Sequence, residues 1–223
     1  MLARPALALA LFVLLFAAAS NADPSPAHEP SFSIRVGVDR TQLEGALGAI
    51  YPHHGATGLI GAGWRFGAGP WRLRTGLQFD SRAGVASGSF TGIGLDFITF
   101  QPETTSVKWR DVWGTNWLEL PLVAERVIGR GGTRSYVGAG LVGGVRLDAA
   151  AVSSHLLPPN EARHADVAAT VTCGLERHEL GSALRLELGA SHGTSSVYAP
   201  GRGPSGSWNA LSLTLDVCPL YRR

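Results

Sequence analysis

Apolar and polar residues alternate with a period of two along eight stretches of the chain. In residues 31–39, for example, Phe32, Ile34 and Val36 share one face, while Ser33 and Arg35 lie on the other. Because successive side chains of a strand point to opposite faces, this pattern is typical of an amphipathic β-strand. Eight strands are predicted in this way, at residues 31–39, 56–66, 71–80, 116–127, 135–148, 166–176, 182–192 and 208–221.

The segments between the predicted strands alternate in length, beginning with a long one, and the short ones include GAGP at residues 67–70. A soluble β-sandwich has no need of such alternation. An outer-membrane barrel has an even number of strands, short periplasmic turns, long external loops and an apolar outer band. We therefore predict an all-β fold, an eight-stranded antiparallel up-and-down transmembrane β-barrel. A soluble, secreted, lipocalin-like barrel that holds a small ligand inside is the alternative.

In a membrane barrel the apolar face of each strand contacts lipid, so the polar face lines the lumen. An eight-stranded barrel has an interior just wide enough for side chains to fill. We therefore predict a network of buried ion pairs that plugs the lumen, and a narrow polar conduit is the alternative. The predicted network consists of Arg35, Arg72, Arg74, Asp80, Glu119, Glu125, Arg146, Arg185 and Glu187. By the same alternation Asp148, Glu176 and Asp216 also face inward.

Aromatic residues gather near both ends of the predicted strands. Interfacial belts of Trp, Tyr and Phe are typical of membrane barrels, so we predict two belts. Trp64, Phe66 and Trp71 would form the belt beside the short turn at 67–70, and Phe79, Trp113, Trp117 and Trp208 the belt at the opposite end.

The stretch NWLELPLVAER at residues 116–126 places Pro121 within an apolar run. A proline in a helix interior removes a hydrogen bond and clashes with the preceding turn, which argues against a helix. As a strand, the stretch places Leu118, Leu120 and Leu122 toward lipid and Glu119 toward the lumen. Since proline cannot donate to the ladder, a local bulge or loosened pairing is predicted at Pro121.

Six residues of this strand also carry a family resemblance: Trp117, Leu118, Glu119, Leu120, Pro121 and Leu122. The sequence WLELPL resembles the aromatic-Leu-Glu-aliphatic-Pro-Leu strand of the PorT-type outer-membrane β-barrel proteins. The resemblance extends over residues 31–221 and implies a small exported barrel. The chain differs from a common outer-membrane pattern because it ends in Leu220, Tyr221, Arg222 and Arg223 and not in a terminal aromatic residue.

The first 30 residues precede the predicted barrel. Residues 1–22 combine one basic residue with an apolar stretch and a small-residue ending, which predicts a secretory signal peptide cleaved after about Ala22. Residues 23–30, DPSPAHEP, are predicted as a flexible N-terminal arm, and residues 31–221 as the outer-membrane barrel domain. The predicted location is the bacterial outer membrane.

The remaining composition gives no sign of nucleic-acid, metal or cofactor binding. A net charge of +2, spread evenly along the chain, argues against nucleic acid. The adjacent His53 and His54 would point apart on an extended chain, and a metal site needs three or four converging ligands. The two cysteines have opposite strand parity, so Cys173 and Cys218 are predicted to face opposite sides and not to form a disulfide.

One short motif suggests chemistry, SHGTSS at residues 191–196. His192 is predicted to face outward, with Thr194 two residues further on. This faintly resembles the His-x-Ser arrangement of lipid A deacylases, although Thr194 replaces the serine and no acid occurs between His192 and Asp216. An outer-wall lipid hydrolase is therefore the alternative, and we expect no enzymatic activity.

Loops of a barrel carry most of its variable functions. We therefore predict a structural or interaction role, with outer-membrane lipid around the barrel and an envelope or extracellular protein as partner. The predicted interaction loops are residues 40–55, 81–112, 149–165 and 193–207.

Overall fold

The structure is a computed structural model of the 223-residue chain. It describes residues 31–67, 70–95, 102–129, 131–148, 163–179, 182–198 and 200–219. The eight strands are β1 (Ser31–Leu43), β2 (His53–Phe66), β3 (Trp71–Leu95), β4 (Pro102–Ile128), β5 (Thr133–Asp148), β6 (Ala165–Glu179), β7 (Ser182–Gly193) and β8 (Trp208–Pro219). One short helix, α2 (Gly45–Ile50), follows β1.

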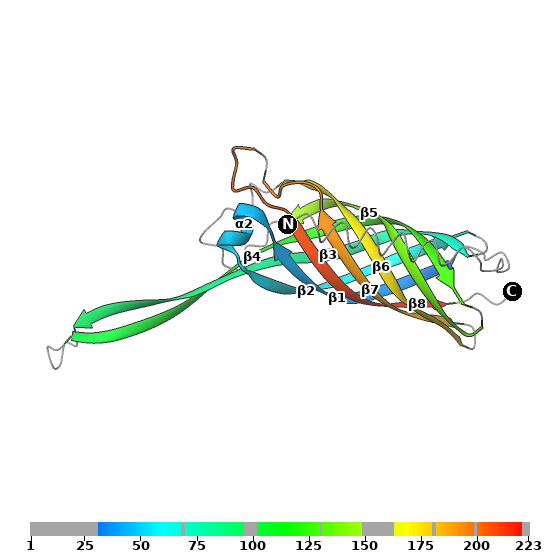
Figure 1. The fold of residues 1–223 in the computed structure, drawn as a ribbon, viewed down its shortest axis with the longest axis horizontal. Coiled ribbons are helices and arrows are strands. Elements are labelled where there is room, and N and C mark those ends of the chain that lie inside the picture. Colours follow the sequence, from blue (N-terminus) through cyan, green and yellow to red (C-terminus); the bar gives the residue numbers. More distant parts are fainter. Residues whose placement is uncertain are drawn as a thin grey trace.

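The strands form one closed barrel in which each strand pairs antiparallel with its neighbours in sequence. The barrel closes because β1 pairs with β8 as well as with β2, as in the pair Arg35↔Asp216. Figure 1 shows the barrel with its long axis horizontal and one hairpin, formed by β3 and β4, projecting far beyond the barrel wall. The predicted fold class, an eight-stranded antiparallel up-and-down transmembrane β-barrel, is confirmed.

The outer face of the barrel carries a belt of large apolar side chains. Val38 is 61% exposed, Leu186 50% and Leu213 43%, whereas Arg72 and Arg185 inside the barrel are only 7% and 1% exposed. Water would not favour this arrangement, because apolar burial drives the folding of soluble proteins. The predicted orientation is confirmed, and the lipocalin-like alternative, which needs an apolar interior, does not fit.

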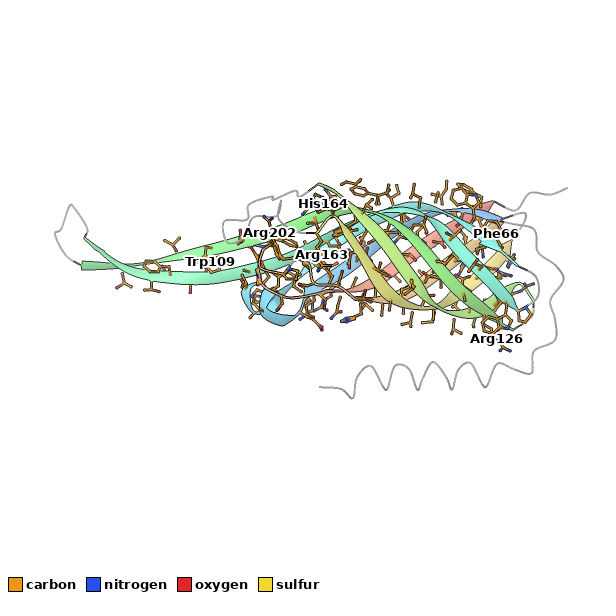
Figure 2. All side chains as sticks on the ribbon, turned by 90° about the horizontal axis from the view of Figure 1, so that it is seen from above. Phe66, Trp109, Arg126, Arg163, His164 and Arg202 are labelled. Atoms are coloured by element: carbon orange, nitrogen blue, oxygen red, sulfur yellow. The ribbon has the colours of Figure 1, made fainter. Side chains whose placement is uncertain are left out.

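The two ends of the barrel differ. The ends of β2, β4 and β6 and the starts of β3, β5 and β7 lie at one end, and α2, residues 200–207 and the β3–β4 hairpin lie at the other. We call them the short-turn end and the external end. Figure 2 places Phe66 and Arg126 near the first, and Arg163, His164 and Arg202 near the second.

Residues 81–112 do not form the predicted loop. Residues 81–95 belong to β3 and residues 102–112 to β4, and these two segments pair from Ser81↔Asn116 to Leu95↔Pro102. Period-two alternation is weak here because a strand that leaves the membrane no longer needs an apolar outer face. The loop predicted at 40–55 likewise contains the end of β1, helix α2 and the start of β2.

The aromatic belt is confirmed at one end and wrong at the other. Trp64, Phe66 and Trp71 at the short-turn end are 37–42% exposed and face outward. Phe79 also faces outward, with 37% exposure. The other three predicted belt residues are buried inside the barrel, where the inward parity of their strands places them: Trp113, Trp117 and Trp208.

Pro121 lies on the inner face of β4. Its strand pairs with β3 at Thr75↔Leu122 and again at Gln78↔Glu119, and the ladder is interrupted between these pairs without a change of register. On the other side Pro121 pairs with Val142 of β5. The predicted loosened pairing is thus confirmed, since proline has no amide hydrogen to give to β3.

Cys173 is exposed, Cys218 is buried, and both are free thiols. The predicted opposite orientation is confirmed.

None of the helices within the described ranges is long and apolar enough to cross a membrane. The predicted signal peptide (1–22), the arm (23–30) and most of the predicted loop at 149–165 lie outside the described residues.

Candidate functional site

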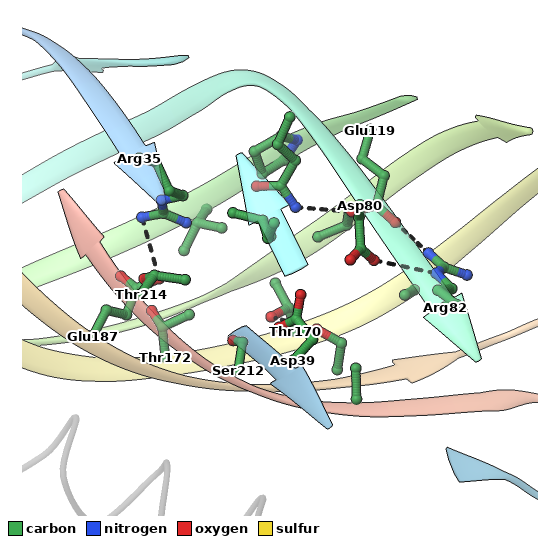
Figure 3. A pocket seen from close by; sticks show the side chains of 18 of the residues that line it. Arg35, Asp39, Asp80, Arg82, Glu119, Thr170, Thr172, Glu187, Ser212 and Thr214 are labelled. Carbon is green, nitrogen blue, oxygen red and sulfur yellow. Dashed lines mark hydrogen bonds and ion pairs between the residues drawn. The ribbon is translucent and has the colours of Figure 1, made fainter. Parts of the chain in front are cut away.

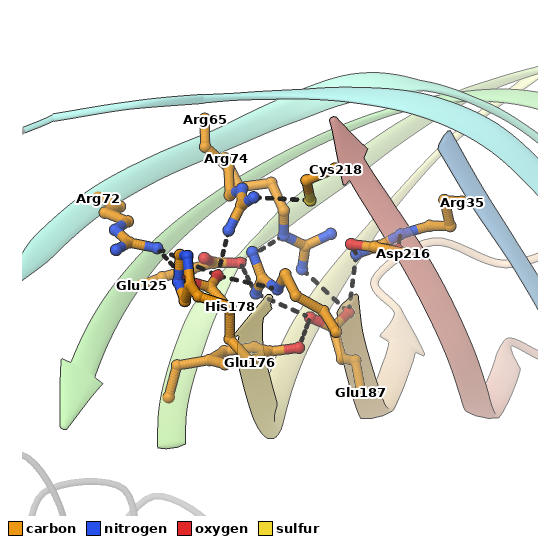
Figure 4. A network of polar contacts seen from close by, with 12 residues as sticks. Arg35, Arg65, Arg72, Arg74, Glu125, Glu176, His178, Glu187, Asp216 and Cys218 are labelled. Atoms are coloured by element: carbon orange, nitrogen blue, oxygen red, sulfur yellow. Dashed lines mark hydrogen bonds and ion pairs between the residues drawn. The ribbon is translucent and has the colours of Figure 1, made fainter. Parts of the chain in front are cut away.

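Toward the short-turn end, the barrel interior holds a network of oppositely charged side chains, which we call the inner charge cluster (Figure 4). Every strand contributes at least one member, and each member is at least nine-tenths buried. The members are Arg35, Arg65, Arg72, Arg74, Glu125, Tyr136, Glu176, Arg185, Glu187 and Asp216.

Arg185 makes several of the central contacts of this cluster. Its Nη2 lies 3.0 Å from Oε1 of Glu125 and 3.7 Å from Oε2 of Glu187. Its guanidinium carbon lies 3.8 Å from the ring centroid of Tyr136, whose hydroxyl donates to Oε2 of Glu187 at 3.0 Å. Gly174 leaves room for this ring, because a Cβ there would lie 2.5 Å from the Tyr136 hydroxyl oxygen.

The other ion pairs extend across the barrel. Arg35 donates from Nε and Nη2 to the two carboxylate oxygens of Asp216 at 2.7 and 2.8 Å. Arg74 bridges Glu125 at 2.5 Å and Glu187 at 3.1 Å. A second group converges on one carboxylate, since Glu176 accepts hydrogen bonds from Arg65, Arg72 and His178.

Burial of an ion costs several kcal/mol, and this cost is recovered only where the partners are well placed. Glu125, Glu176 and Glu187 each contact two or more arginines, and Asp216 receives a two-point contact. The cluster therefore connects strands that are not neighbours in the sheet, and removal of one member would leave an uncompensated charge.

A second group surrounds Arg82 toward the external end, and we call it the Arg82 cluster. Nη1 of Arg82 donates to Asp166 at 2.9 Å, Nη2 donates to Glu119, and Nε contacts Asp80 at 3.5 Å. The guanidinium carbon lies 4.6 Å from the ring centroid of Trp117. Because Asp166 is on β6, Arg82 of β3 reaches across the lumen.

A polar cavity of about 60 Å³ adjoins both clusters (Figure 3). Its charged lining comes from Arg35, Arg74 and Glu187 of the inner charge cluster and from Asp39, Asp80, Arg82 and Glu119. Asp39 Oδ2 and Thr214 Oγ1 are buried in this region without a hydrogen-bond partner among the described residues. A polar cavity of this size has room for several water molecules.

An apolar core covers the lumen at the external end, and we call it the cap. It consists of Leu43, Leu47, Tyr51, Ala86, Trp113, Val197, Tyr198 and Trp208. The rings of Trp113 and Trp208 stack with centroids 5.3 Å apart, and Tyr198 lies 6.1 Å from Trp113. The hydroxyl of Tyr51 donates to Asp111 of β4 at 2.8 Å, which ties the segment after α2 to the barrel wall.

The structure places eight of the nine predicted lumen residues in the two clusters. Six belong to the inner charge cluster, and Asp80 and Glu119 contact Arg82. The ninth, Arg146, is half-buried on β5, and its backbone N–H donates to the carbonyl of His164 at 2.8 Å. It belongs to neither cluster as defined here.

The prediction from the sequence does not include five interior charges: Asp39, Arg65, Arg82, Asp111 and Asp166. The signal for Arg65 was present, because Trp64 and Phe66 on either side face outward. Arg82 was missed because strand β3 was ended too early, at Asp80. Asp39 and Asp166 lie at strand ends, where alternation alone does not show whether the barrel wall continues.

The β3–β4 hairpin is a second feature that the sequence did not predict. Beyond Val85↔His53 and Asn116↔Asp148, its strands pair only with each other within the described chain. At about 3.3 Å per residue, the ten residues of β3 from 86 to 95 extend about 30 Å. Trp109 in this hairpin is labelled in Figure 2.

The two faces of the hairpin differ chemically. Phe90 and Val107 are paired on one face, are 68% and 56% exposed, and lie beside Trp109, which is 45% exposed. The indole of Trp109 crosses Gly88, where a Cβ would lie 2.8 Å from the ring atoms. The opposite face pairs serines with cations, in Ser87↔Arg110 and Ser89↔Lys108.

His192 faces outward at the external end of β7, as predicted. Its Nδ1 lies 2.5 Å from Oδ1 of Asn209, an amide and not the carboxylate that a triad uses. Thr194 Oγ1 donates to the carbonyl of Val167 at 2.7 Å. Neither contact has the geometry expected of a nucleophile activated by a base.

The described ranges contain no group of three or more His, Cys, Asp and Glu side chains that could hold a metal ion.

No protein-family model matches the chain, and a search of curated protein sequences found no relative. The solved structures that are similar to it include three bacterial β-barrel proteins. Neisserial surface protein A is 9% identical with a TM-score of 0.47, covering 85% of this chain and 99% of that one. The N-terminal β-barrel domain of Pseudomonas aeruginosa OprF is 12% identical with a TM-score of 0.37, covering 84% and 99%. Ail, the attachment invasion locus protein of Yersinia pestis, is 8% identical with a TM-score of 0.35, covering 86% and 99%.

These similarities are too weak to argue from, so the class rests on the strand pairing and side-chain orientation of this chain. Its closed eight-stranded sheet, apolar outer belt and charged interior define a small outer-membrane-type β-barrel.

Proposed function

We propose that the protein is a small bacterial outer-membrane barrel with a plugged lumen, and that its external side serves as an interaction surface. The proposal that the lumen is plugged rests on one observation: the inner charge cluster, the Arg82 cluster and the cap follow one another along the lumen. Ions would have to pass the stacked rings of Trp113 and Trp208 and then two sets of ion pairs. On this proposal the interior stabilises the barrel and conducts nothing.

Export belongs to the same proposal. Residues 1–22 act as a signal peptide cleaved after about Ala22, residues 23–30 form a flexible arm, and the barrel domain spans 31–221. Membership of the PorT-type family is proposed on the strand WLELPL at 117–122 alone. In the proposed membrane orientation the hairpin and the cap face the cell exterior.

A planar-bilayer recording of the purified barrel tests the plug. We expect no stable conductance steps from the wild-type protein. The double variant Arg82→Ala, Trp113→Ala should also show none, because the inner charge cluster still closes the lumen toward the short-turn end. Stable steps from the folded wild-type protein would contradict the proposed plug.

The interaction surface is proposed to be the apolar face of the hairpin, and the partner an envelope or extracellular protein. The exposed side chains of Phe90, Val107 and Trp109 support this, since apolar patches above the membrane favour protein contacts. A photo-crosslinking residue at position 90 should capture the partner on intact cells, and one at Ser89 on the opposite face should not. Equal yields at both positions, or none at position 90, would argue against this surface.

A further inference from the structure

The outer face of the described strands carries positive charge. Nine acidic residues of the strands have described side chains, and all nine are buried: Asp39, Asp80, Asp111, Glu119, Glu125, Asp166, Glu176, Glu187 and Asp216. By contrast, Arg40, Lys108, Arg110 and Arg177 are exposed on the outer face. The outer face of the strands therefore has no described carboxylate to repel an anion, and the exposed Glu44 lies just beyond the end of β1.

One group of polar residues lies on this outer face at the external end, and we call it the outer-wall patch. It consists of Arg40, Gln42, His192 and Asn209. Gln42 of β1 is opposite Asn209 of β8, and Asn209 is opposite His192 of β7, so the three form a row across three strands. Arg40 is opposite Leu211, which places it diagonally next to Asn209, at about 7–8 Å.

One contact within the patch orients two of its side chains. His192 Nδ1 lies 2.5 Å from the Asn209 side-chain oxygen, an arrangement in which the imidazole donates and its Nε2 faces away. Ala169 is opposite His192 on the other side and is small, so the imidazole is not covered from β6. The patch thus offers a guanidinium, an imidazole and two amides on one side of the barrel.

The patch borders the lipid-facing belt directly. On the same face, Val38 follows Arg40 toward the short-turn end, and Leu213 is opposite Val38. Leu188 is opposite Leu213 on β7, and these three side chains are 61%, 43% and 53% exposed. A molecule that contacts both surfaces needs an anionic head and an apolar tail at this spacing.

We propose that the outer-wall patch binds the phosphate of a lipid headgroup in the external leaflet, with the acyl chains of that lipid lying along Val38, Leu188 and Leu213. Arg40 supplies the charge and a donor fork suited to phosphate oxygens. His192 and Gln42 supply further donors. This binding depends on the membrane orientation of the barrel but not on any partner of the hairpin, so the two proposals fail independently.

Native mass spectrometry of the full chain in maltoside micelles, which contain no phosphate, tests this site. The probe is bisphosphorylated lipid A, compared with the same lipid after phosphatase treatment. We expect Arg40→Gln to weaken binding of the phosphorylated lipid about fivefold, the effect of one cation at a membrane surface. Arg177→Gln, which removes an outward arginine at the short-turn end, should leave binding unchanged.

The lipid comparison separates headgroup from acyl recognition. Wild-type protein should bind the dephosphorylated lipid about as weakly as the Arg40→Gln variant binds the phosphorylated lipid. Inorganic phosphate at millimolar concentration should not displace bound lipid. Equal binding of the two lipids by the wild-type protein would overturn the proposal, and so would full displacement by inorganic phosphate. If the Arg40→Gln variant does not fold, the His192→Gln variant is compared with wild-type protein in the same way. An unchanged affinity of this variant for the phosphorylated lipid would overturn the proposed site.

Discussion

At the scale of single residues, loss of one interior charge is expected to destabilise the barrel strongly. Glu125 is fully buried and contacts both Arg74 and Arg185. A buried ion pair contributes little net stability when intact, but loss of one partner costs about 3–5 kcal/mol, because the other charge remains buried.

The variant Arg185→Met is expected to lower the unfolding free energy by about 3–5 kcal/mol. Urea unfolding in micelles, followed by tryptophan fluorescence, measures the change. Arg177→Met is the matched control, because Arg177 is exposed on the outer face and its removal should change stability by under about 1 kcal/mol. Equal effects of the two variants on the unfolding free energy would show that the buried ion pairs of Arg185 are not needed for stability.

The two cysteines report on the orientation of the wall. In vesicles, a lipid-soluble maleimide should label Cys173, which is exposed on the apolar belt, and should not label Cys218, which is buried beside Arg65. Both thiols should react after unfolding in urea. If Cys218 in the folded barrel were labelled as fast as Cys173, its side chain would not face the barrel interior.

At the scale of elements, the hairpin is separable from the barrel. Beyond the cap, residues 87–95 and 102–110 pair with each other and with no other described strand. Ala86 and Asp111 remain necessary, since Ala86 packs in the cap and Asp111 accepts the Tyr51 hydrogen bond.

Replacement of residues 87–110 by Asn-Gly should therefore preserve the barrel. Ala86 and Asp111 are directly opposite, and a two-residue turn of this sequence suits such a pair. We expect an unfolding free energy within about 1 kcal/mol of the wild type, together with loss of crosslinking at the proposed interaction surface. A deletion variant that cannot refold would show that the hairpin is needed for barrel assembly.

At the scale of the whole molecule, the two ends of the barrel are expected to lie on opposite sides of the membrane. Protease added to intact cells should cleave the hairpin and leave the short turn at 129–132 intact. Cleavage of the short turn and not of the hairpin on intact cells would contradict the proposed orientation. Mass spectrometry of the fragments identifies the cut positions.

The sequence by itself determined the strand number, the closed antiparallel order and the inward or outward orientation of the strand residues, because a pleated strand in lipid requires strict alternation. The alternation of Leu118, Glu119 and Leu120 sufficed to place a buried charge between two lipid contacts. Only the tertiary structure decided which charges meet. Arg82 contacts Asp166 across the lumen, a pairing set by strand tilt and register and not by sequence spacing.

The tertiary structure also decided where alternation loses its meaning. Above the membrane, β3 and β4 no longer face lipid, so the alternation does not predict the hairpin. It also assigns Trp113 and Trp208 to an interfacial belt, although their rings stack inside the cap. The alternation of apolar and polar residues arises because one face of a strand contacts lipid and the other faces the lumen. Where water lies on both sides of a strand, packing against distant segments determines the structure, and the local sequence does not contain that information.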